Sequence, residues 1–208
     1  MATPKKITPF ADAVKAAGAA NIAIKSRNSL DWYRKYCASK LSGINTFNDI
    51  KNTGEVVTMN KLRLGNIYTF QYSPKHKDTL PYYDSTPMII PFKDLGSTFY
   101  AFNLHYLPHA QRAMAMDALF KISNSGKTGN AELQSKYEVI MAMSKSSLFK
   151  PCVKQYLKSN VRSRFLEFKP EHWEIAIFLP TANFKKMSES KVHKDSMSSI
   201  SKKYKRKK

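Results

Sequence analysis

Residues 62–108 read LRLGNIYTFQYSPKHKDTLPYYDSTPMIIPFKDLGSTFYAFNLHYLP, and this stretch holds most of the strand-like sequence of the chain. Aromatic residues alternate with other types over 66–72, so a strand here has one continuous aromatic face, formed by Tyr68, Phe70 and Tyr72. Residues 88–92 and 98–104 are typical of two more strands, separated by a turn at 94–97. Short strands joined by tight turns pair antiparallel by default. The stretch therefore predicts a small antiparallel sheet whose aromatic face needs a partner layer.

Two prolines affect the second of these strands. Pro87 and Pro91 cannot donate hydrogen bonds to a ladder, so we expect this strand to lie partly at an edge of the sheet. Later in the chain, residues 161–168 alternate in the manner of a strand. Residues 173–179 also alternate, and although Pro170 suits the start of a helix equally well, we favour a strand there.

Helical spacing of apolar residues occurs on both sides of the predicted sheet. Residues 28–43 begin with an N-cap at Asn28 or Ser29 and keep this spacing until Gly43, which predicts a helix. Three later segments are also typical of helices, namely 110–122, 131–143 and 152–157. We expect these three to form a helical insertion over 108–158.

The chain is strongly basic. It has 208 residues, with 35 Lys and Arg against 15 Asp and Glu and a formal net charge of +20. This excess is greater than solubility requires and implies a polyanionic partner, either nucleic acid or an anionic membrane surface. No apolar run approaches the ~20 residues of a membrane-spanning helix, so nucleic acid is the favoured partner. Two cysteines are too few for a disulfide framework or a zinc site.

Much of this charge lies near the ends of the chain. Residues 185–208 contain ten Lys or Arg against two acidic residues, a net charge of +8, and their composition predicts a disordered basic tail. Residues 1–27 predict a flexible basic arm, with a short helix at 10–17 as an option. We therefore expect a single domain over 28–184 between the arm and the tail.

Basic side chains are the candidates for binding phosphates. Lysines in a flexible segment neutralise phosphates without fixed geometry, so binding is expected to be independent of sequence and to weaken steeply with salt. Tyr82 and Tyr83 are candidates for stacking on exposed bases, although a cover over the core explains them somewhat better. A solvated loop explains the lysines at 75–77 equally well. The candidate DNA-binding residues are Lys75, Lys77, Arg162, Arg164, Lys185, Lys186, Lys202, Lys203, Lys205, Arg206, Lys207 and Lys208.

Catalytic and metal-binding patterns are weak. His105 and His109 have the spacing of helical metal ligands, but Pro108 lies between them and no carboxylate motif completes a zinc site. The sequence SGKT at 125–128 is similar to the end of a phosphate-binding loop, but it lacks the preceding glycine and follows a helix. Aspartates within 78–94 lie in turns, where this residue is common for backbone reasons. We expect no catalytic residues, no metal and no cofactor.

Several runs carry a family resemblance. They are GNIYTFQYSPKHKDTLPYYD at 65–84, PMIIPF at 87–92, FNLHYLPHAQRAMAMDAL at 102–119 and FKPCVKQYLKSNVRSRFLEFKPEHWEIAIFLPTANF at 149–184. Over roughly 29–197 the chain resembles the DNA end protector proteins of large contractile-tailed (myovirus) bacteriophages. It departs from the family pattern at Ser85-Thr86, where an Arg-Phe pair is expected, and at Ala101, where glycine is usual.

The resemblance implies a minor virion protein at the head–tail connection that binds the ends of packaged linear double-stranded DNA. Such a protein enters the host cytoplasm with the DNA and shields its ends from host exonuclease. The resemblance carries over no catalytic residues, so we expect no enzyme. An alternative is a neck or baseplate assembly protein that docks on other virion proteins, such as the portal, with the basic tail in a secondary role. A nuclease that uses a divalent metal is a third and weaker hypothesis.

The expected fold is α+β. We expect a small antiparallel, SH3-like barrel whose strands lie within about 62–107 and 161–180. An N-terminal helix and the helical insertion over 108–158 would elaborate the barrel, and both basic termini would be disordered.

Overall fold

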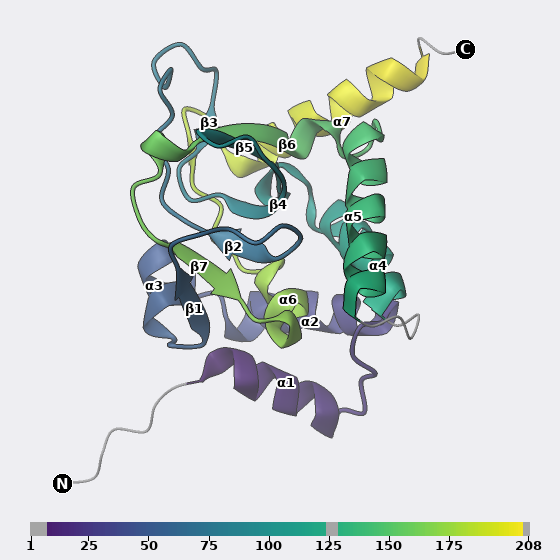
Figure 1. Ribbon diagram of the computed structural model, residues 1–208. Coiled ribbons are helices and arrows are strands. Elements are labelled where there is room, and N and C mark those ends of the chain that lie inside the picture. Colours follow the sequence, from purple (N-terminus) through teal and green to yellow (C-terminus); the bar gives the residue numbers. More distant parts are fainter. Residues whose placement is uncertain (1–7, 124–128, 206–208) are drawn as a thin grey trace, which may run out of the picture.

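The computed structural model describes residues 8–123 and 129–205, and it is built around one six-stranded sheet (Figure 1). The strands are β1 (Val56–Met59), β2 (Ile67–Thr69), β3 (Tyr83–Asp84), β4 (Met88–Asp94), β5 (Thr98–Asn103), β6 (Val153–Leu157), β7 (Phe165–Phe168) and β8 (Phe184–Lys185). The main sheet has the order β1-β7-β2-β4-β5-β6, and every neighbouring pair in it is antiparallel. A second, small sheet pairs β3 with β8.

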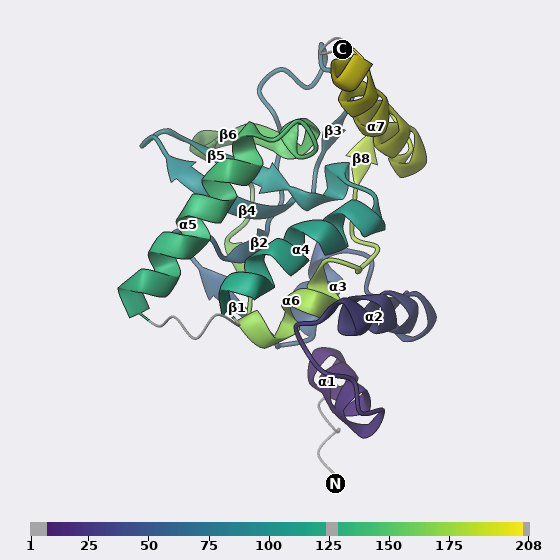
Figure 2. The ribbon, with the colours of Figure 1, turned by 90° about the vertical axis from the view of Figure 1, so that its right-hand side faces the viewer.

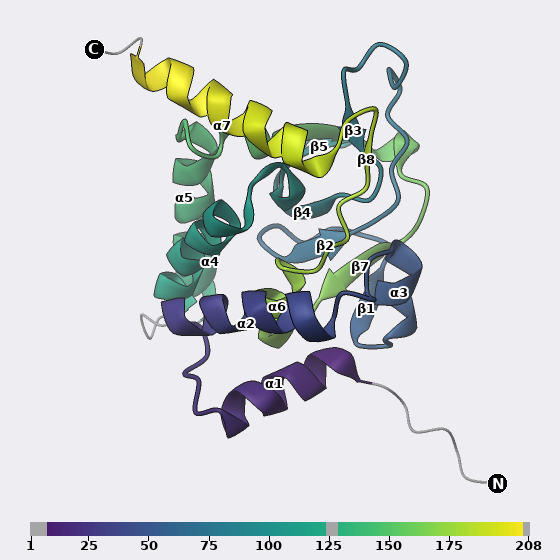
Figure 3. The same cartoon turned by 180° about the vertical axis from the view of Figure 1, so that it is seen from behind.

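Helices surround the main sheet. They are α1 (Pro9–Ala19), α2 (Arg27–Lys40), α3 (Phe47–Asn52), α4 (His109–Ser123), α5 (Gly129–Lys145), α6 (Trp173–Ala176) and α7 (Glu189–Lys205). The 3-10 turns are η1 (Leu104–Tyr106), η2 (Lys150–Cys152), η3 (Lys158–Asn160) and η4 (Pro170–His172). Helices α4 and α5 lie along one side of the sheet (Figure 2), whereas α1 and α2 gather at the end near β1. Helix α7 lies at the opposite end, beside β3 and β8 (Figure 3).

The main core lies between one face of the sheet and the helices. Ile67 of β2, Met88 of β4 and Phe168 of β7 are fully buried and belong to the same apolar cluster as Tyr33 and Cys37 of α2. Burial of large apolar side chains contributes roughly 1.5–3 kcal/mol each, so this layer supplies most of the stability of the fold. The predicted helix at 28–43 is confirmed as α2, although its capping residue is Ser26, which accepts a hydrogen bond from the amide of Ser29.

The other face of the sheet carries the aromatic cluster that the alternation over 66–72 predicts. The ring centroid of Phe70 lies 5.1 Å from that of Phe165 in β7 and 5.5 Å from that of Tyr156 in β6. Strands β7 and β6 are separated by β2, β4 and β5 in the sheet, so these ring contacts require the sheet to curl around Phe70. The curl stops short of closure, because β1 and β6 do not pair within the described residues. The α+β class is confirmed, but the SH3-like barrel is not: the sheet is open.

Strand β4 is a central strand, so the edge position inferred from its prolines is wrong. It lies between β2 and β5, and its register with β5 shifts between Pro91 and Lys93. A bulge is a position at which an interior strand tolerates proline, because the ladder is interrupted there. The carbonyl oxygen of Pro91 accepts a hydrogen bond from the amide of Gly65 at 2.8 Å, and Gly65 adopts the left-handed φ of 85° that this turn requires.

Two later segments differ from their predicted structure. Residues 152–157, predicted as a helix, contain β6, which pairs with β5 and places Tyr156 opposite Phe99. The helical insertion therefore ends before β6. Residues 173–179, for which the alternation favours a strand, begin with the short helix α6. Every residue from Trp173 to Leu179 is buried. The segment therefore has no exposed side whose spacing would distinguish the helical period of 3.6 residues from the strand period of two.

The two basic ends also contain packed helices. Helix α7 occupies most of the segment whose composition predicts a disordered tail, and Val192, Ser196 and Ile200 bury one side of it against the body. Its first turn is fixed by Glu189, which accepts a hydrogen bond from the buried guanidinium of Arg112 at 2.9 Å. Helix α1 occupies much of the predicted flexible arm and is a turn longer than the optional helix at 10–17.

Candidate nucleic-acid interface

The pairing of β3 with β8 brings several predicted DNA-binding residues together. Tyr83 lies opposite Lys185 in this pairing, so the loop over 73–82 lies next to the segment that leads into α7 (Figure 3). Lys75 and Lys77 are exposed in the loop, and Lys185 is exposed in β8. These three lysines therefore lie at one end of the molecule, where they can contact the same phosphate backbone.

Lys186 has a structural role that the sequence alone does not reveal. Its ammonium donates hydrogen bonds to the carbonyl oxygens of Asp78 at 2.8 Å and Leu80 at 3.0 Å. The residue itself has a left-handed φ of 68°, which is uncommon for a residue other than glycine. Lys186 therefore holds in place the loop that carries Lys75 and Lys77.

The remaining predicted residues lie elsewhere. Arg162 and Arg164 are exposed between η3 and β7, and the amide of Arg162 donates to the carbonyl oxygen of Gln71 at 2.8 Å. This bond places the two arginines beside the segment after β2. The final part of α7 contains Lys202, Lys203 and Lys205. Outside the described residues lie Arg206, Lys207 and Lys208.

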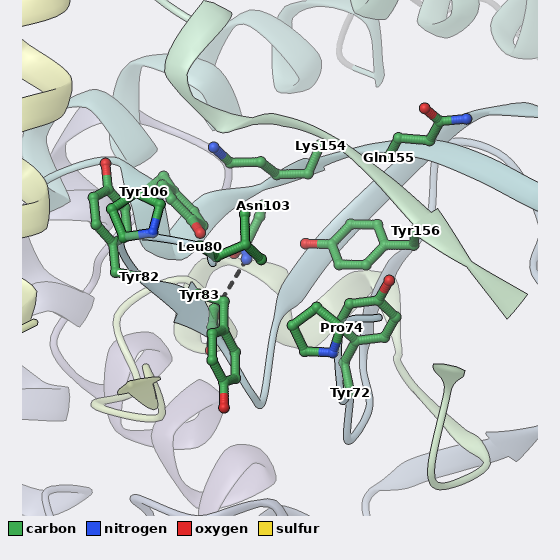
Figure 4. Close-up of a pocket in the computed structure, with 12 residues that line it drawn as sticks. Tyr72, Pro74, Leu80, Tyr82, Tyr83, Asn103, Tyr106, Lys154, Gln155 and Tyr156 are labelled. Atoms are coloured by element: carbon green, nitrogen blue, oxygen red, sulfur yellow. Dashed lines mark hydrogen bonds between the residues drawn. The ribbon is translucent and has the colours of Figure 1, made fainter. Parts of the chain in front are cut away.

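A pocket of about 300 Å³ opens at the same end of the molecule as the loop over 73–82 (Figure 4). Its walls include tyrosine rings from different elements, namely the buried Tyr72, Tyr106 of η1 and Tyr156 of β6 and the half-buried Tyr83 of β3. Tyr82 also lines the pocket and donates from its hydroxyl to Asp195 of α7 at 2.6 Å. The structure thus brings both predicted stacking residues to one cavity, and their role in binding bases stays a prediction.

One cation points into this aromatic pocket. The ammonium nitrogen of Lys154, on β6, lies 3.8 Å from the centroid of the Tyr106 ring (Figure 4). It has no ion pair and no hydrogen bond to any residue in 8–123 and 129–205. Burial lowers the pKa of Lys154 to about 8. The carboxylate of Asp195 attracts this ammonium but makes no ion pair with it, so an anion bound in the pocket would be stabilised by a direct contact.

The polar floor of the pocket is a hydrogen-bond network around Asp84. One carboxylate oxygen lies 2.7 Å from Nδ1 of His105 and accepts from the amide group of Asn103 at 3.0 Å. The other accepts from the backbone amides of Thr86 at 3.0 Å and Asn183 at 3.3 Å. Burial alone would raise the pKa of Asp84, but attraction to His105 and these hydrogen bonds hold it below its usual value. Both carboxylate oxygens are therefore occupied by the protein itself.

His105 also connects Asp84 to a hydroxyl. Its Nε2 lies 3.3 Å from Oγ1 of Thr181, an order of groups similar to the acid, base and hydroxyl of some hydrolases. All three residues are buried, with 4% or less of their surface exposed, so a substrate cannot reach the hydroxyl. The three residues therefore tie β3, η1 and the segment before β8 together.

Neither a cluster of metal ligands nor a membrane-spanning helix occurs in the described part of the chain. It contains no group of three or more His, Cys, Asp or Glu residues able to hold a metal ion. None of its helices has the length and apolar character needed to span a bilayer.

Sequence reasoning missed the most distinctive member of the pocket. The role of Lys154 is hidden when residues 152–157 are interpreted as a helix. In a strand, Lys154 and Tyr156 point to the same side of the sheet, and this spacing of two is the signal that could have found them.

The chain matches a known protein family over nearly its whole length. Residues 7–203 match the family described as the phage T4 terminal DNA protecting protein, which covers nearly the whole chain. Comparisons with curated proteins and with solved structures gave no match. The resemblance inferred from the runs within 65–184 is thus confirmed. This family protects the ends of phage DNA and acts as a structural protein, not as an enzyme. The chain therefore belongs to the family of the phage T4 terminal DNA protecting protein.

Proposed function

We propose that this protein is carried in the virion at the head–tail connection, where it binds the ends of the packaged linear duplex. It then enters the host cytoplasm with the DNA and shields the ends from host exonuclease. The observation that carries the proposal is the family match over residues 7–203. A formal charge of +20 supports tight binding to a polyanion of any sequence.

The arrangement of lysines supports a particular surface for this binding. Lys191 and Lys194 are exposed on α7, on the side away from the buried Val192. We call this surface, together with the loop over 73–82 and β8, the basic end of the molecule; its exposed lysines are Lys75, Lys77, Lys185, Lys191 and Lys194. A duplex held there would have its terminus beside the aromatic pocket.

The proposal is tested first with purified protein. A linear duplex is treated with an exonuclease that degrades linear double-stranded DNA, with and without the protein, and surviving full-length DNA is measured. We expect protection greater than that given by a polylysine of equal total charge, because the ends are bound specifically. Protection no better than that of polylysine would contradict a role in protecting ends.

The second test separates end protection from assembly. Phage particles that lack the protein are used to infect hosts with and without their exonuclease for linear DNA. Rescue of infection only in the exonuclease-free host is the expected result. Particles that lack a joined tail, and fail in both hosts, would instead support the neck or baseplate role. Copurification of the protein with a portal or neck protein would test its proposed contacts in the virion.

A further inference from the structure

The aromatic pocket has features that binding to a smooth duplex does not use. A phosphate backbone is bound by exposed lysines, whereas this pocket is concave, lined by tyrosine rings and supplied with one cation, Lys154. Its volume of about 300 Å³ lies at the lower end of the range for small-ligand sites, which suits a single nucleotide and excludes a paired stretch of duplex.

Its chemistry matches the two parts of a nucleotide. Tyrosine rings stack on any nucleobase, because every base has a π face. The ammonium of Lys154 makes no ion pair and no hydrogen bond within the described residues, and the carboxylate of Asp195 attracts it only from a distance, so a phosphate oxygen can bind it directly. Asp195 lies nearby but is hydrogen-bonded by Tyr82, at 2.6 Å from its hydroxyl.

The floor of the pocket offers little means of distinguishing one base from another. The carboxylate of Asp84 is fully occupied, and the side-chain oxygen of Asn103 accepts from the amide of His105 at 3.0 Å. Base identity is determined by hydrogen bonds to base edges, so a site whose polar groups are already bonded accepts any base. This property suits a protein that must bind DNA ends of any sequence.

We propose that the pocket holds the unstacked terminal nucleotide of a DNA strand, with its base against the tyrosine rings and its phosphate at Lys154. This inference rests on the proposed function and explains how the protein would distinguish an end from the interior of a duplex. A terminal base is stacked on one side only, so extruding it costs less than extruding an internal base, which is stacked on both sides. Internal nucleotides are also tethered on both sides and cannot enter a concave pocket as readily.

The first test compares open and closed DNA. Binding is measured for a linear duplex and for a covalently closed circle of the same sequence and length, and the wild-type protein should prefer the linear form. Lys154→Gln and Tyr83→Leu should each weaken binding to the linear duplex about tenfold, the effect of removing a stacking or charge interaction. Affinity for the circle should stay unchanged, which also shows that each variant is folded.

A matched control uses Lys35→Gln, which removes one exposed positive charge from α2, far from the pocket. This variant should keep the full preference for linear DNA. If Lys154→Gln and Tyr83→Leu keep it as well, the inference is wrong.

The second test locates the terminal base directly. A duplex with 5-iodouracil at its terminal position is irradiated in complex with the protein, and crosslinked peptides are identified by mass spectrometry. We expect crosslinks to the pocket tyrosines from the terminal position and none from an internal one. A terminal base that crosslinks only to peptides outside the pocket would overturn the assignment. That result would leave the proposed function intact. Failure of the wild-type protein to protect linear DNA from exonuclease would instead contradict the proposed function itself.

Discussion

Lys154 makes the charge of the pocket sensitive to pH in the neutral range. Burial lowers its pKa to about 8, so the ammonium loses its proton as the pH rises through that value. Burial also raises the pKa of Tyr82 and of Cys152 to about 12, and the pKa of Asp84 lies below its usual value, so these neighbours keep their charge states between about pH 7 and pH 9. The titratable groups that surround the ammonium are Tyr72, Tyr82, Tyr83, Asp84, Tyr106, Cys152, Tyr156 and Asp195.

The direction in which pH changes DNA binding depends on which protonation state of Lys154 binds phosphate. Only the protonated ammonium attracts phosphate, so the preference for linear over circular DNA should fall as the pH is raised from about 7 to about 9. Binding of the two DNA forms is measured over this range at constant salt. The side chain of the Lys154→Gln variant does not titrate in this range. Its preference for linear over circular DNA should be smaller than that of the wild type and should not change with pH. A wild-type preference that stays constant to pH 9 would show that the ammonium does not touch the end.

Some residues of the pocket can be predicted from the sequence, whereas others cannot. Tyr82 and Tyr83 can be found because two adjacent aromatic residues follow a proline in an otherwise polar loop; in the structure both are half-buried. Lys154 is one of many lysines, and its separate role depends on β6 lying beside η1. The spacing of Lys154 and Tyr156 in a strand shows only that they share a face of the sheet; the contact of Lys154 with Tyr106 is a tertiary contact that this spacing does not encode.

At the scale of elements, α1 is held by a group from a distant part of the chain. The carboxylate of Glu55 accepts hydrogen bonds from the backbone amides of Phe10 at 2.8 Å and Ala11 at 2.7 Å. It thus caps the N-terminus of α1 in place of Thr8, whose side chain makes no capping bond. The buried ring of Phe10 fixes the same turn against Phe168.

Removal of this cap should loosen α1 alone. Glu55→Ala should lower the free energy of unfolding by about 1 kcal/mol, because caps contribute about that much, and should increase amide hydrogen exchange over residues 9–19. Glu171→Gln, at an exposed acidic residue of η4, is the control and should change neither quantity. Exchange in α1 that is the same in both variants would mean that Phe10, and not Glu55, holds the helix.

Elements differ in how far their sequence determines them. Strand β2 could be predicted because one of its faces is aromatic and the other mixed, and the sheet uses that contrast. The amphipathic pattern of α7 consists of Val192, Ser196 and Ile200 among lysines and serines, and a serine on the buried side hides the apolar stripe. Closure of the sheet also lies beyond local patterns, because it depends on whether β1 and β6 meet.

Over the whole molecule, the basic end and α1 lie at opposite extremes (Figure 1). This separation allows the electrostatic part of DNA binding to be tested without disturbing the core. Replacing five lysines of α7 by glutamine should make the plot of log affinity against log salt shallower by about 0.9 for each phosphate that the protein no longer neutralises. The five are Lys191, Lys194, Lys202, Lys203 and Lys205.

An equal change of charge at the other extreme is the control. It replaces five exposed lysines on or near α1, α2 and α3, namely Lys15, Lys35, Lys40, Lys51 and Lys169. Both proteins then have the same net charge, and the slope should change much less in the control. Equal slopes in the two proteins would show that DNA binding responds to the total charge and not to the lysines of α7.

The position of β7 in the sheet has a consequence for the order in which the protein is made. Strand β7 lies between β1 and β2, although it follows them by about a hundred residues in the chain. In the finished sheet β1 and β2 each pair with β7 and lie two strand spacings, roughly 10 Å, apart, so neither has this partner while the ribosome synthesises the intervening segments. The nascent chain therefore exposes two unpaired strand edges until residues 165–168 emerge. Completion of the sheet is thus one of the last events of synthesis, and only η4, α6, β8 and α7 emerge after it.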